Sequence, residues 1–398
     1  MQTRLLPLLM LLVLFSPLAI DIYLPSMPAM AADFAASDAA IQLTIVIFLF
    51  AMGLGQILIG PLADKFGRRP VALAGISLYA VAALIDAFSQ TYEQLLIGRV
   101  LQGFAACATS IVAFSAVRDS VSAKEGGTYY SYLNGAICVV PALAPTLGGL
   151  LAIQWGWRAS FVFMALFAVV IFSVIFGKFA ETKAPDEKAK SQKLYAWARY
   201  QPVLSNSNFL FYALSCMAAM AAILCYVSYA PMYLIGELGI SELTFTALFG
   251  FNAIINIAAC FIAPIIVKRI GNVDSVRWSM LLFMGAGILQ LISVKLWPAS
   301  GLAFMLPMLL LCCGFALLLG PATAMALAPF AERAGTASAM LGCIQMSLAA
   351  VMVAVIQQTS LAPEQAVAFA CIAPSLVFLG LMASKKLNVW HKDTTEEH

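Results

Sequence analysis

The residues of this sequence that could carry chemistry are the few charged side chains that interrupt long apolar runs. Asp21 lies inside the run 5–32, about 24 Å along a helix that begins where the run begins, and Arg99 lies inside the run 94–117. Removal of a carboxylate from water disfavours its charged form, so such a group binds a proton readily. The only two histidines stand in the polar tail, which leaves a carboxylate as the proton carrier within the apolar runs.

We therefore expect Asp21 to bind a proton and a substrate in alternation. Pro25 and Pro28 follow it and are expected to unwind the end of its helix. The alternative is an acid at a helix end that the outer medium simply wets. Asp86, close to the end of another apolar run, is expected to be interfacial.

The residue types that other chemistry needs do not gather in these runs. The nine cysteines include no Cys-x-x-Cys pair and no metal-ligand spacing, so we interpret them as small buried hydrophobes. No Gly-x-x-x-x-Gly-Lys-Ser/Thr loop occurs, so an ion gradient rather than ATP is the expected energy source. An enzyme would need a nucleophile, histidine or metal ligands at one place. The sequence therefore predicts no cofactor, no metal and no enzymatic activity.

The composition indicates an integral membrane protein. Of 398 residues, 63% are hydrophobic and only 10% are charged, whereas a soluble domain carries roughly 25% charged residues. A membrane-spanning helix needs about 20 mostly apolar residues. Such stretches are expected at 5–32, 40–62, 70–90, 94–117, 127–152, 159–178, 207–235, 244–267, 278–298, 301–330, 334–358 and 363–384. The first and tenth are long enough to tilt or bend.

The basic residues predict the orientation of these spans. Of the 22 Lys and Arg residues, all but three fall in segments on the same side as the N-terminus. The three exceptions are Arg99, Arg158 and Lys295. The positive-inside rule then places both termini in the cytoplasm. A cleaved signal peptide is the alternative for the first span. That span is about twice as long as a signal h-region and contains Asp21, which argues against cleavage.

A charged stretch divides the twelve spans into six and six. The predicted organisation is a six-helix bundle at 1–178, a cytoplasmic linker at 179–206 and a second bundle with a short cytoplasmic tail at 207–398. Gly60–Arg68 follows the second span, and the similar segment Ala263–Gly271 follows the eighth. Such repetition is typical of transporters built from two parallel halves.

The segment from Gly60 to Arg69 resembles the loop signature of the major facilitator superfamily of secondary transporters. The resemblance implies an all-α membrane fold of 12 transmembrane helices in two six-helix bundles. The glycines are expected to allow a tight turn, and Pro61 is expected to help end the preceding helix. The implied gating residues, which would steady the outward-facing state, are Gly60, Asp64, Gly67, Arg68 and Arg69. A generic basic turn is the alternative.

The segment Leu95–Gly103 resembles a second motif of that family, including its intramembrane arginine. The resemblance implies a role for Arg99 in proton coupling, together with Asp21. A charge at membrane depth is costly and is normally retained for a partner or a pathway. Arg99 is near the outer end of its span, so a structural arginine that snorkels to the surface is the alternative.

Two further segments are similar to the drug-antiporter branch of the family. In the fifth span, the residues that resemble the branch motif are Gly135, Pro141, Ala144, Pro145, Gly148 and Gly149. The prolines are expected to bend this helix, and the glycine pair is expected to let a neighbour pack closely. Ser16–Pro28 resembles the first helix of the Bcr/CflA-type drug–proton antiporters.

The expected function is proton-coupled antiport that exports drug-like or amphipathic small molecules across the inner membrane by alternating access. A proton-coupled uptake symporter for a small metabolite is the alternative. A cavity with one acid and otherwise aromatic and amide groups suits poorly specified amphipathic compounds. The candidate cavity residues are Tyr23, Gln102, Asn134, Tyr226, Asn252, Asn256 and Gln345. The expected partners are a small-molecule substrate, protons and membrane lipid; nucleic acid is not expected, and the chain is expected to be a monomer.

Overall fold

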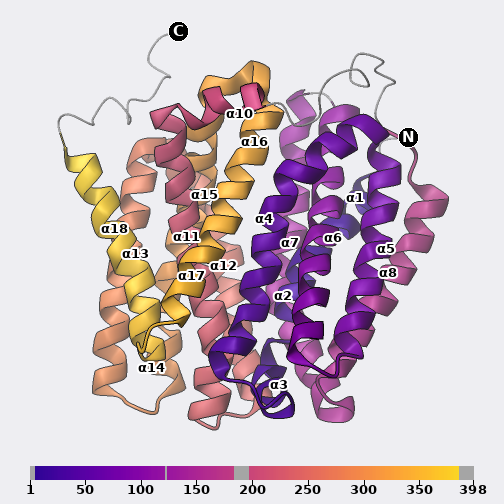
Figure 1. Cartoon of the computed structure of the whole chain (residues 1–398). Helices are drawn as coiled ribbons and strands as arrows, with labels where there is room; N and C mark the ends of the chain where they lie inside the picture. Colours follow the sequence, from indigo (N-terminus) through magenta and orange to yellow (C-terminus); the bar gives the residue numbers. More distant parts are fainter. Residues whose placement is uncertain (1–4, 122, 183–196, 385–398) are drawn as a thin grey trace. The chain divides into compact units, whose positions relative to one another are not determined.

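The computed structural model describes residues 5–121, 123–182 and 197–384, and nearly all of them are helical. Within these residues, twelve helical segments are long and apolar enough to cross a membrane, as the sequence predicted (Figure 1). The segments are Leu5–Asp33, Asp38–Phe66, Arg68–Ala87, Tyr92–Ser120, Thr128–Trp155, Arg158–Lys178, Ser207–Glu237, Glu242–Ile270, Asn272–Leu296, Gly301–Phe330, Ala334–Gln357 and Pro363–Ala383. The chain is a multi-pass membrane protein.

The helices group into two compact units, Met1–Ala196 and Trp197–His398. Six of the spans belong to each unit. Much of the predicted cytoplasmic linker lies outside the described residues, as do the chain ends on which the expected orientation partly depends.

The first unit is assembled around α6 (Tyr92–Ser120). This helix packs along α4 (Asp38–Phe66) and α5 (Arg68–Ala87). The helix α5 also lies along α8 (Arg158–Lys178), whereas α7 (Ala123–Trp155) contacts the segments of the first span. The helices α4 and α5 therefore both pack against α6, the helix that carries Arg99.

Small residues allow the backbones of α4, α5 and α6 to approach closely. A Cβ atom on Gly103 would lie 2.3 Å from the carbonyl oxygen of Phe48 on α4. On α5, a Cβ atom on Gly75 would lie 2.7 Å from the Cβ of Ala108 on α6. Membrane helices commonly associate through such small residues, because they gain van der Waals contact without a hydrophobic driving force.

The first span is not one continuous helix. It consists of α1 (Leu5–Val13), α2 (Phe15–Asp21), the short 3₁₀ turn η2 (Leu24–Ser26) and α3 (Met27–Asp33). Pro25 occupies the start of the 3₁₀ turn. The bending and the unwinding after Asp21 that the sequence predicted are both present, but Pro28 lies in the first turn of α3 and not in the unwound part.

The connection between α4 and α5 is tighter than the sequence predicted. Gly60 and Pro61 were expected in a loop, but α4 continues through both of them to Phe66. Pro61 does not end the helix. The helix ends instead at Gly67, whose φ of 98° is unfavourable for a side chain, and α5 begins with the next residue. The expected loop is therefore a single-residue turn.

The second unit repeats this construction. The helix α12 (Glu242–Ile270) has 29 residues, like α4, and the side chain of Ser241 caps it as Ser37 caps α4. It ends at Gly271 with φ 83°, and α13 (Asn272–Leu296) begins immediately afterwards. The same cap, length and glycine turn at corresponding places support the repeat that the sequence suggested.

The other helices of the second unit include three interruptions. The helix α11 (Ser207–Pro231) passes into a π-helical turn, η3 (Met232–Glu237). The tenth span bends as predicted, between α14 (Gly301–Met305) and α15 (Met308–Leu327), and then continues as the 3₁₀ segment η4 (Ala328–Arg333). The eleventh contains a second π-helical turn, η5, within the run α16 (Ala334–Cys343), η5 (Ile344–Leu348) and α17 (Ala349–Gln357). A short α10 (Trp197–Leu204) opens the unit and α18 (Pro363–Ala383) closes it.

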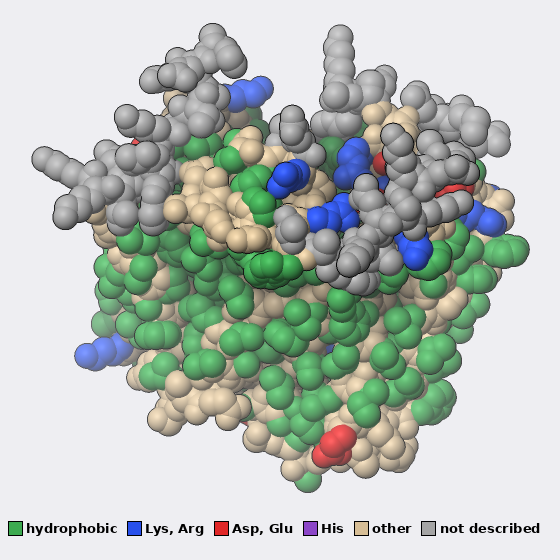
Figure 2. All heavy atoms as spheres, turned by 45° about the horizontal axis from the view of Figure 1, so that its top comes forward, with side chains coloured by type: hydrophobic (Ala, Val, Ile, Leu, Met, Phe, Trp, Pro, Cys, Tyr) green, Lys and Arg blue, Asp and Glu red, His purple; other side chains and the backbone are tan. Residues whose placement is uncertain are grey.

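Large apolar side chains are exposed along the sides of the helices. Examples are Leu166 and Val170 on α8, and Phe261 and Ile265 on α12. Figure 2 shows hydrophobic side chains over much of the visible face, with most of the visible Lys and Arg side chains gathered above them. These exposed apolar faces suit contact with lipid.

Candidate functional site

Arg99 is fully buried in α6 and turns towards the interior of the first unit. Its Nε donates a hydrogen bond to the carbonyl oxygen of Thr44 at 3.2 Å, and its Nη1 donates to Oε1 of Gln102. The centre of the guanidinium lies 4.9 Å from the ring centroid of Tyr23 and 4.6 Å from that of Phe48. Arg99 therefore does not snorkel to the surface. Both aromatic faces and the hydrogen bonds stabilise its charge.

Tyr23 reaches this arginine because the first span unwinds at that point. Its hydroxyl lies 2.8 Å from Oγ1 of Thr44, whose own proton is donated to the carbonyl oxygen of Ile41 at 2.6 Å. The Tyr23 hydroxyl must then be the donor to Thr44. This chain of hydrogen bonds ties the first span to α4, directly beside Arg99.

Gln102 links the same cluster to α8. It stands one helical turn after Arg99 and is fully buried, and its Nε2 lies 3.6 Å from the Sδ of Met164. The structure thus brings together Tyr23, Arg99 and Gln102, three of the residues that the sequence proposed for coupling and for the cavity.

Asp21 is the last residue of α2, and its side chain is only 5% exposed. In the part of the chain that the structure describes, its carboxylate has no hydrogen bond and no ion pair, and none joins it to Arg99. A buried carboxylate without partners is much more stable when it is protonated. Asp21 is therefore suited to bind a proton.

The α7 residues that resemble the drug-antiporter motif support the position of Asp21. A Cβ atom on Gly148 would lie 1.5 Å from the carbonyl oxygen of Ile22, the residue after Asp21. The close packing expected of this helix is present at Gly148. At Gly135, in contrast, a Cβ atom would meet nothing within 4 Å. Pro141, Pro145 and the buried Gly149 lie within the same helix, which continues through both prolines.

Asp86, which was expected to be interfacial, is covered by protein rather than wetted. Its side chain is fully buried near the end of α5, and its Oδ1 lies 2.0 Å from the position of a Cβ atom on Gly98. Gly98 precedes Arg99, so the carboxylate lies against the backbone of the helix that carries the arginine. The position of Asp86 in an apolar run did not reveal this burial, because the glycine that it packs against lies on another helix.

In the second unit, Tyr226 and Asn252 meet. Asn252 donates from Nδ2 to the Tyr226 hydroxyl and to the carbonyl oxygen of Met305, both at 3.1 Å. The Tyr226 ring stacks on Phe249 at a centroid distance of 5.6 Å. These two candidate cavity residues form one buried, neutral polar group.

The remaining candidate cavity residues lie apart from these clusters. Asn256 is one turn after Asn252 on α12, and its Oδ1 lies 3.8 Å from the Sγ of Cys260. Gln345 lies in the π-helical turn η5 and is half-buried, whereas Asn134 is exposed on α7. The structure does not unite these three with Arg99 or with Tyr226 through a hydrogen bond among the described residues.

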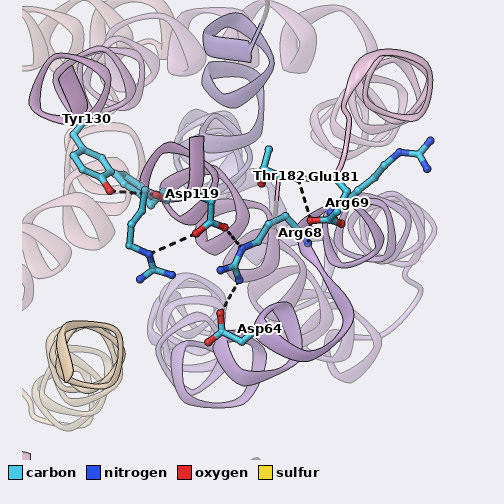
Figure 3. A network of polar contacts seen from close by, with 9 residues as sticks. Asp64, Arg68, Arg69, Asp119, Tyr130, Glu181 and Thr182 are labelled. Atoms are coloured by element: carbon cyan, nitrogen blue, oxygen red, sulfur yellow. Dashed lines mark hydrogen bonds and ion pairs between the residues drawn. The ribbon is translucent and has the colours of Figure 1, made fainter. Parts of the chain in front are cut away.

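At the start of α5, Arg68 forms the centre of a charged network (Figure 3). Its Nη1 lies 2.9 Å from Oδ1 of Asp64, and its Nε lies 2.7 Å from Oδ2 of Asp119 at the end of α6. Arg68 is 2% exposed, so these ion pairs are shielded from solvent more than ordinary surface pairs. They join α4, α5 and α6 at one end of the unit.

Glu181 is a residue of this network that sequence reasoning missed. Its carboxylate accepts hydrogen bonds from the backbone N–H groups of Arg68 at 2.8 Å and Arg69 at 3.0 Å. It thereby satisfies free donors at the N-terminus of α5 and complements the helix dipole. The Arg69 guanidinium donates to the carbonyl oxygen of Phe176 on α8 at 2.7 Å. The only sequence signal was an acid just after the sixth span, far along the chain from the turn that it caps.

Comparisons with known proteins agree with this architecture. The family description of the Major Facilitator Superfamily matches residues 9–354. Multidrug resistance protein MdtL from Klebsiella pneumoniae subsp. pneumoniae is 31% identical over 392 residues, which cover 97% of each chain. Multidrug resistance protein MdtL from Shewanella oneidensis is 29% identical over 342 residues, 86% of this chain and 85% of that protein.

Solved structures show the same fold at low sequence identity. The xylose transporter XylE from E. coli, in a partially occluded inward open conformation, has a TM-score of 0.75 and 15% identity, with 96% of each chain covered. A D-xylose-proton symporter has a TM-score of 0.73 and 16% identity, with 94% of this chain and 97% of that chain covered.

Proposed function

The chain belongs to the Major Facilitator Superfamily, and from this premise we propose that it exports drug-like or amphipathic small molecules in exchange for protons. Membership of this family makes the protein a transporter rather than an enzyme. Export of drugs is supported by the relatives named as multidrug resistance proteins, which cover almost the whole chain.

The observation that carries the proton coupling is the buried carboxylate of Asp21, which has no hydrogen-bond or ion-pair partner among the described residues. In the proposed cycle a proton neutralises this carboxylate, and its release leaves a negative charge that favours bound substrate. Proton and substrate therefore exclude each other, which is the thermodynamic requirement for antiport. The two six-helix units would expose the site to either side in turn, by alternating access.

The chemistry of the buried polar groups supports a substrate with few hydrogen-bonding requirements. In the second unit, Tyr226 and Asn252 satisfy each other, and the groups are neutral. A sugar would need many free hydrogen-bonding groups, whereas an amphipathic compound needs aromatic contact and few polar ones.

We place the protein in the bacterial inner membrane with both termini in the cytoplasm, as a monomer.

The direction of proton movement tests this function. Inside-out membrane vesicles that contain the protein are energised to acidify their lumen, and lumenal pH is followed with a fluorescent amine. Ethidium and chloramphenicol serve as a cationic and a neutral probe, beside any compound found in a resistance screen. Antiport predicts that addition of a transported probe raises lumenal pH, because protons leave as the probe enters.

The uptake symporter predicts the opposite sign. Its substrate and protons would move together, so addition of the substrate would lower lumenal pH further. Vesicles with the empty expression vector measure passive leakage of the probe. Co-movement of protons and probe, or no resistance and no proton movement with any compound, would rule out the proposed antiport.

A further inference from the structure

Asp86 is a buried carboxylate to which the proposed transport cycle assigns no role. Asp86 is fully buried on α5, and its carboxylate lies against the backbone of Gly98 on α6. Any residue with a Cβ atom in place of Gly98 would collide with Oδ1 at 2.0 Å. The glycine therefore leaves a space that the carboxylate fills, one residue before the buried arginine.

The polar atoms of this pair are incompletely satisfied. Within the described residues, neither Oδ1 nor Oδ2 of Asp86 has a hydrogen-bond partner, and Nη2 of Arg99 also has none. The other two nitrogens of Arg99 donate to Thr44 and Gln102. An ionised carboxylate without partners is very costly to bury, whereas a carboxylate paired with a guanidinium is tolerated. The spare donor of Arg99 offers that pairing.

Arg99, one residue after Gly98, is the buried cation of α6, and among the described residues no ion pair joins it to Asp86. Tyr23, from the first span, and Tyr79, on α5 itself, are fully buried titratable residues of the same unit. Both hydroxyls are engaged, with Thr44 and with the carbonyl oxygen of Phe15.

The two other helices that pack on α5 add no second counter-charge at this depth. On α4, the charged residues are near the ends, at Asp38, Asp64 and Lys65. On α8, Arg158 is the charged residue at the Asp86 end, and its Nη2 donates to the carbonyl oxygen of Ser89 at 3.0 Å. Arg158 therefore bonds to the backbone beyond the end of α5 and is not paired with the Asp86 carboxylate.

The same arginine joins the end of α5 that carries Asp86 to partly exposed polar groups. Arg158 pairs with Asp33 at 2.6 Å, and both side chains are partly exposed, at 37% and 45%. Ser89, to which Arg158 is bonded, donates from its Oγ to the carbonyl oxygen of Asp86 at 2.8 Å. Solvent-accessible polar groups therefore reach to within about one helical turn of the buried carboxylate.

We propose that Asp86 is a second proton-binding site of the transport cycle, with Arg99 as its counter-charge. When Asp86 is protonated, the pair carries only the positive charge of Arg99. When the proton leaves to water, the carboxylate pairs with the spare Nη2 donor, and the guanidinium keeps its own protons. The inference rests on the proposed proton coupling and extends it from one carboxylate, Asp21, to two.

Infrared difference spectroscopy of the purified protein tests this inference without any substrate. A change of pH is expected to give separate carbonyl bands of protonated carboxyl groups for Asp86 and Asp21. Asp86→Asn should remove one band and Asp21→Asn the other, whereas the exposed Asp38→Asn should remove neither. In Arg99→Gln, loss of the counter-charge should let the Asp86 band persist to more alkaline pH. A spectrum of Asp86→Asn identical to that of the wild type would overturn the proposal.

A measurement on the wild type covers the case in which the Asp86 variant does not fold. Dicyclohexylcarbodiimide, an apolar reagent that attacks protonated carboxyl groups, should label Asp86 at acidic and neutral pH and progressively less at alkaline pH. Asp274, exposed and paired with Arg277, is the control that should stay unlabelled. No label on Asp86 at any pH would count against protonation of this residue.

A transport measurement distinguishes failure of this inference from failure of the proposed function. In proteoliposomes, Asp86→Asn should carry one proton fewer for each probe molecule exchanged. If the wild type exchanges protons for probe but the Asp86 variant has an unchanged proton count, Asp86 is not a coupling site and the antiport proposal stands. If the wild type moves no protons, the proposed function itself fails.

Discussion

The buried environment of Arg99 bears on whether this arginine snorkels to the membrane surface. The sequence left open a snorkelling arginine, because the residue is near the end of its span. The structure buries it between Tyr23 and Phe48 and gives it hydrogen bonds to Thr44 and Gln102. These contacts depend on the planar guanidinium, which a lysine cannot imitate.

We predict that Arg99→Lys lowers transport roughly tenfold or more, because it loses charge-assisted hydrogen bonds worth about 1.5–3 kcal/mol each. The measurement is the initial rate of probe-driven proton release in inside-out vesicles, corrected for the amount of inserted protein. Lys295→Arg, an exchange between the same two residue types near a membrane surface, is the matched control. Equal rates for Arg99→Lys and the wild type would remove Arg99 from the mechanism.

At the residue scale, sequence identified the charged groups but not their surroundings. Asp21 and Arg99 were recognisable because charges are rare in apolar runs. The burial of Asp86 was not recognisable, since it depends on the packing of the carboxylate against Gly98 of α6. Glu181 was missed for the same reason: its partners are backbone N–H groups of Arg68 and Arg69, which carry no signal in the sequence.

Among the elements, the turn between α4 and α5 depends on one glycine rather than two. Gly67 has φ 98°, and a Cβ atom there would lie 2.5 Å from Oε2 of Glu181. Gly60 lies inside α4 with open space around it. The family-like segment thus contains one glycine that the conformation requires and one that it does not.

We predict opposite effects of alanine at these two glycines. Gly67→Ala should destabilise the protein by about 1–3 kcal/mol, through a strained backbone and displacement of Glu181. Gly60→Ala should be neutral or stabilising by up to about 1 kcal/mol, because alanine favours the helix. Thermal unfolding in detergent, followed by tryptophan fluorescence, gives both values. A larger loss of stability at Gly60 than at Gly67 would contradict the observed end of α4.

The contact between α7 and the break in the first span gives a second test at this scale. Gly148→Ala would place a Cβ atom 1.5 Å from the carbonyl oxygen of Ile22, so the two segments must separate. We predict a loss of about 1–3 kcal/mol in stability, as for other overpacked sites, and reduced exchange because Asp21 is displaced. Gly135→Ala, on the same helix but without neighbours, is the control. Equal stability and equal proton exchange in both variants would show that the contact between Gly148 and Ile22 does not position Asp21.

For the whole molecule, hydropathy and charge alone predicted twelve spans, because a bilayer demands long apolar helices and little else. The repeat between the two halves was also predicted from the sequence. In the structure, α4 and α12 share their length, serine cap and glycine turn. The interruptions were only partly predictable. Proline marked the break after Asp21, whereas no sequence pattern marked the π-helical turns at η3 and η5.

The central claim for the whole molecule is that protonation of Asp21 couples substrate export to the proton gradient. The most direct measurement compares Asp21→Asn with wild type and with Asp38→Asn in acidified inside-out vesicles, with matched amounts of inserted protein. Wild type and Asp38→Asn are predicted to release protons when the transported probe is added, and Asp21→Asn is predicted to release none. Proton release by Asp21→Asn at the wild-type rate would contradict the account.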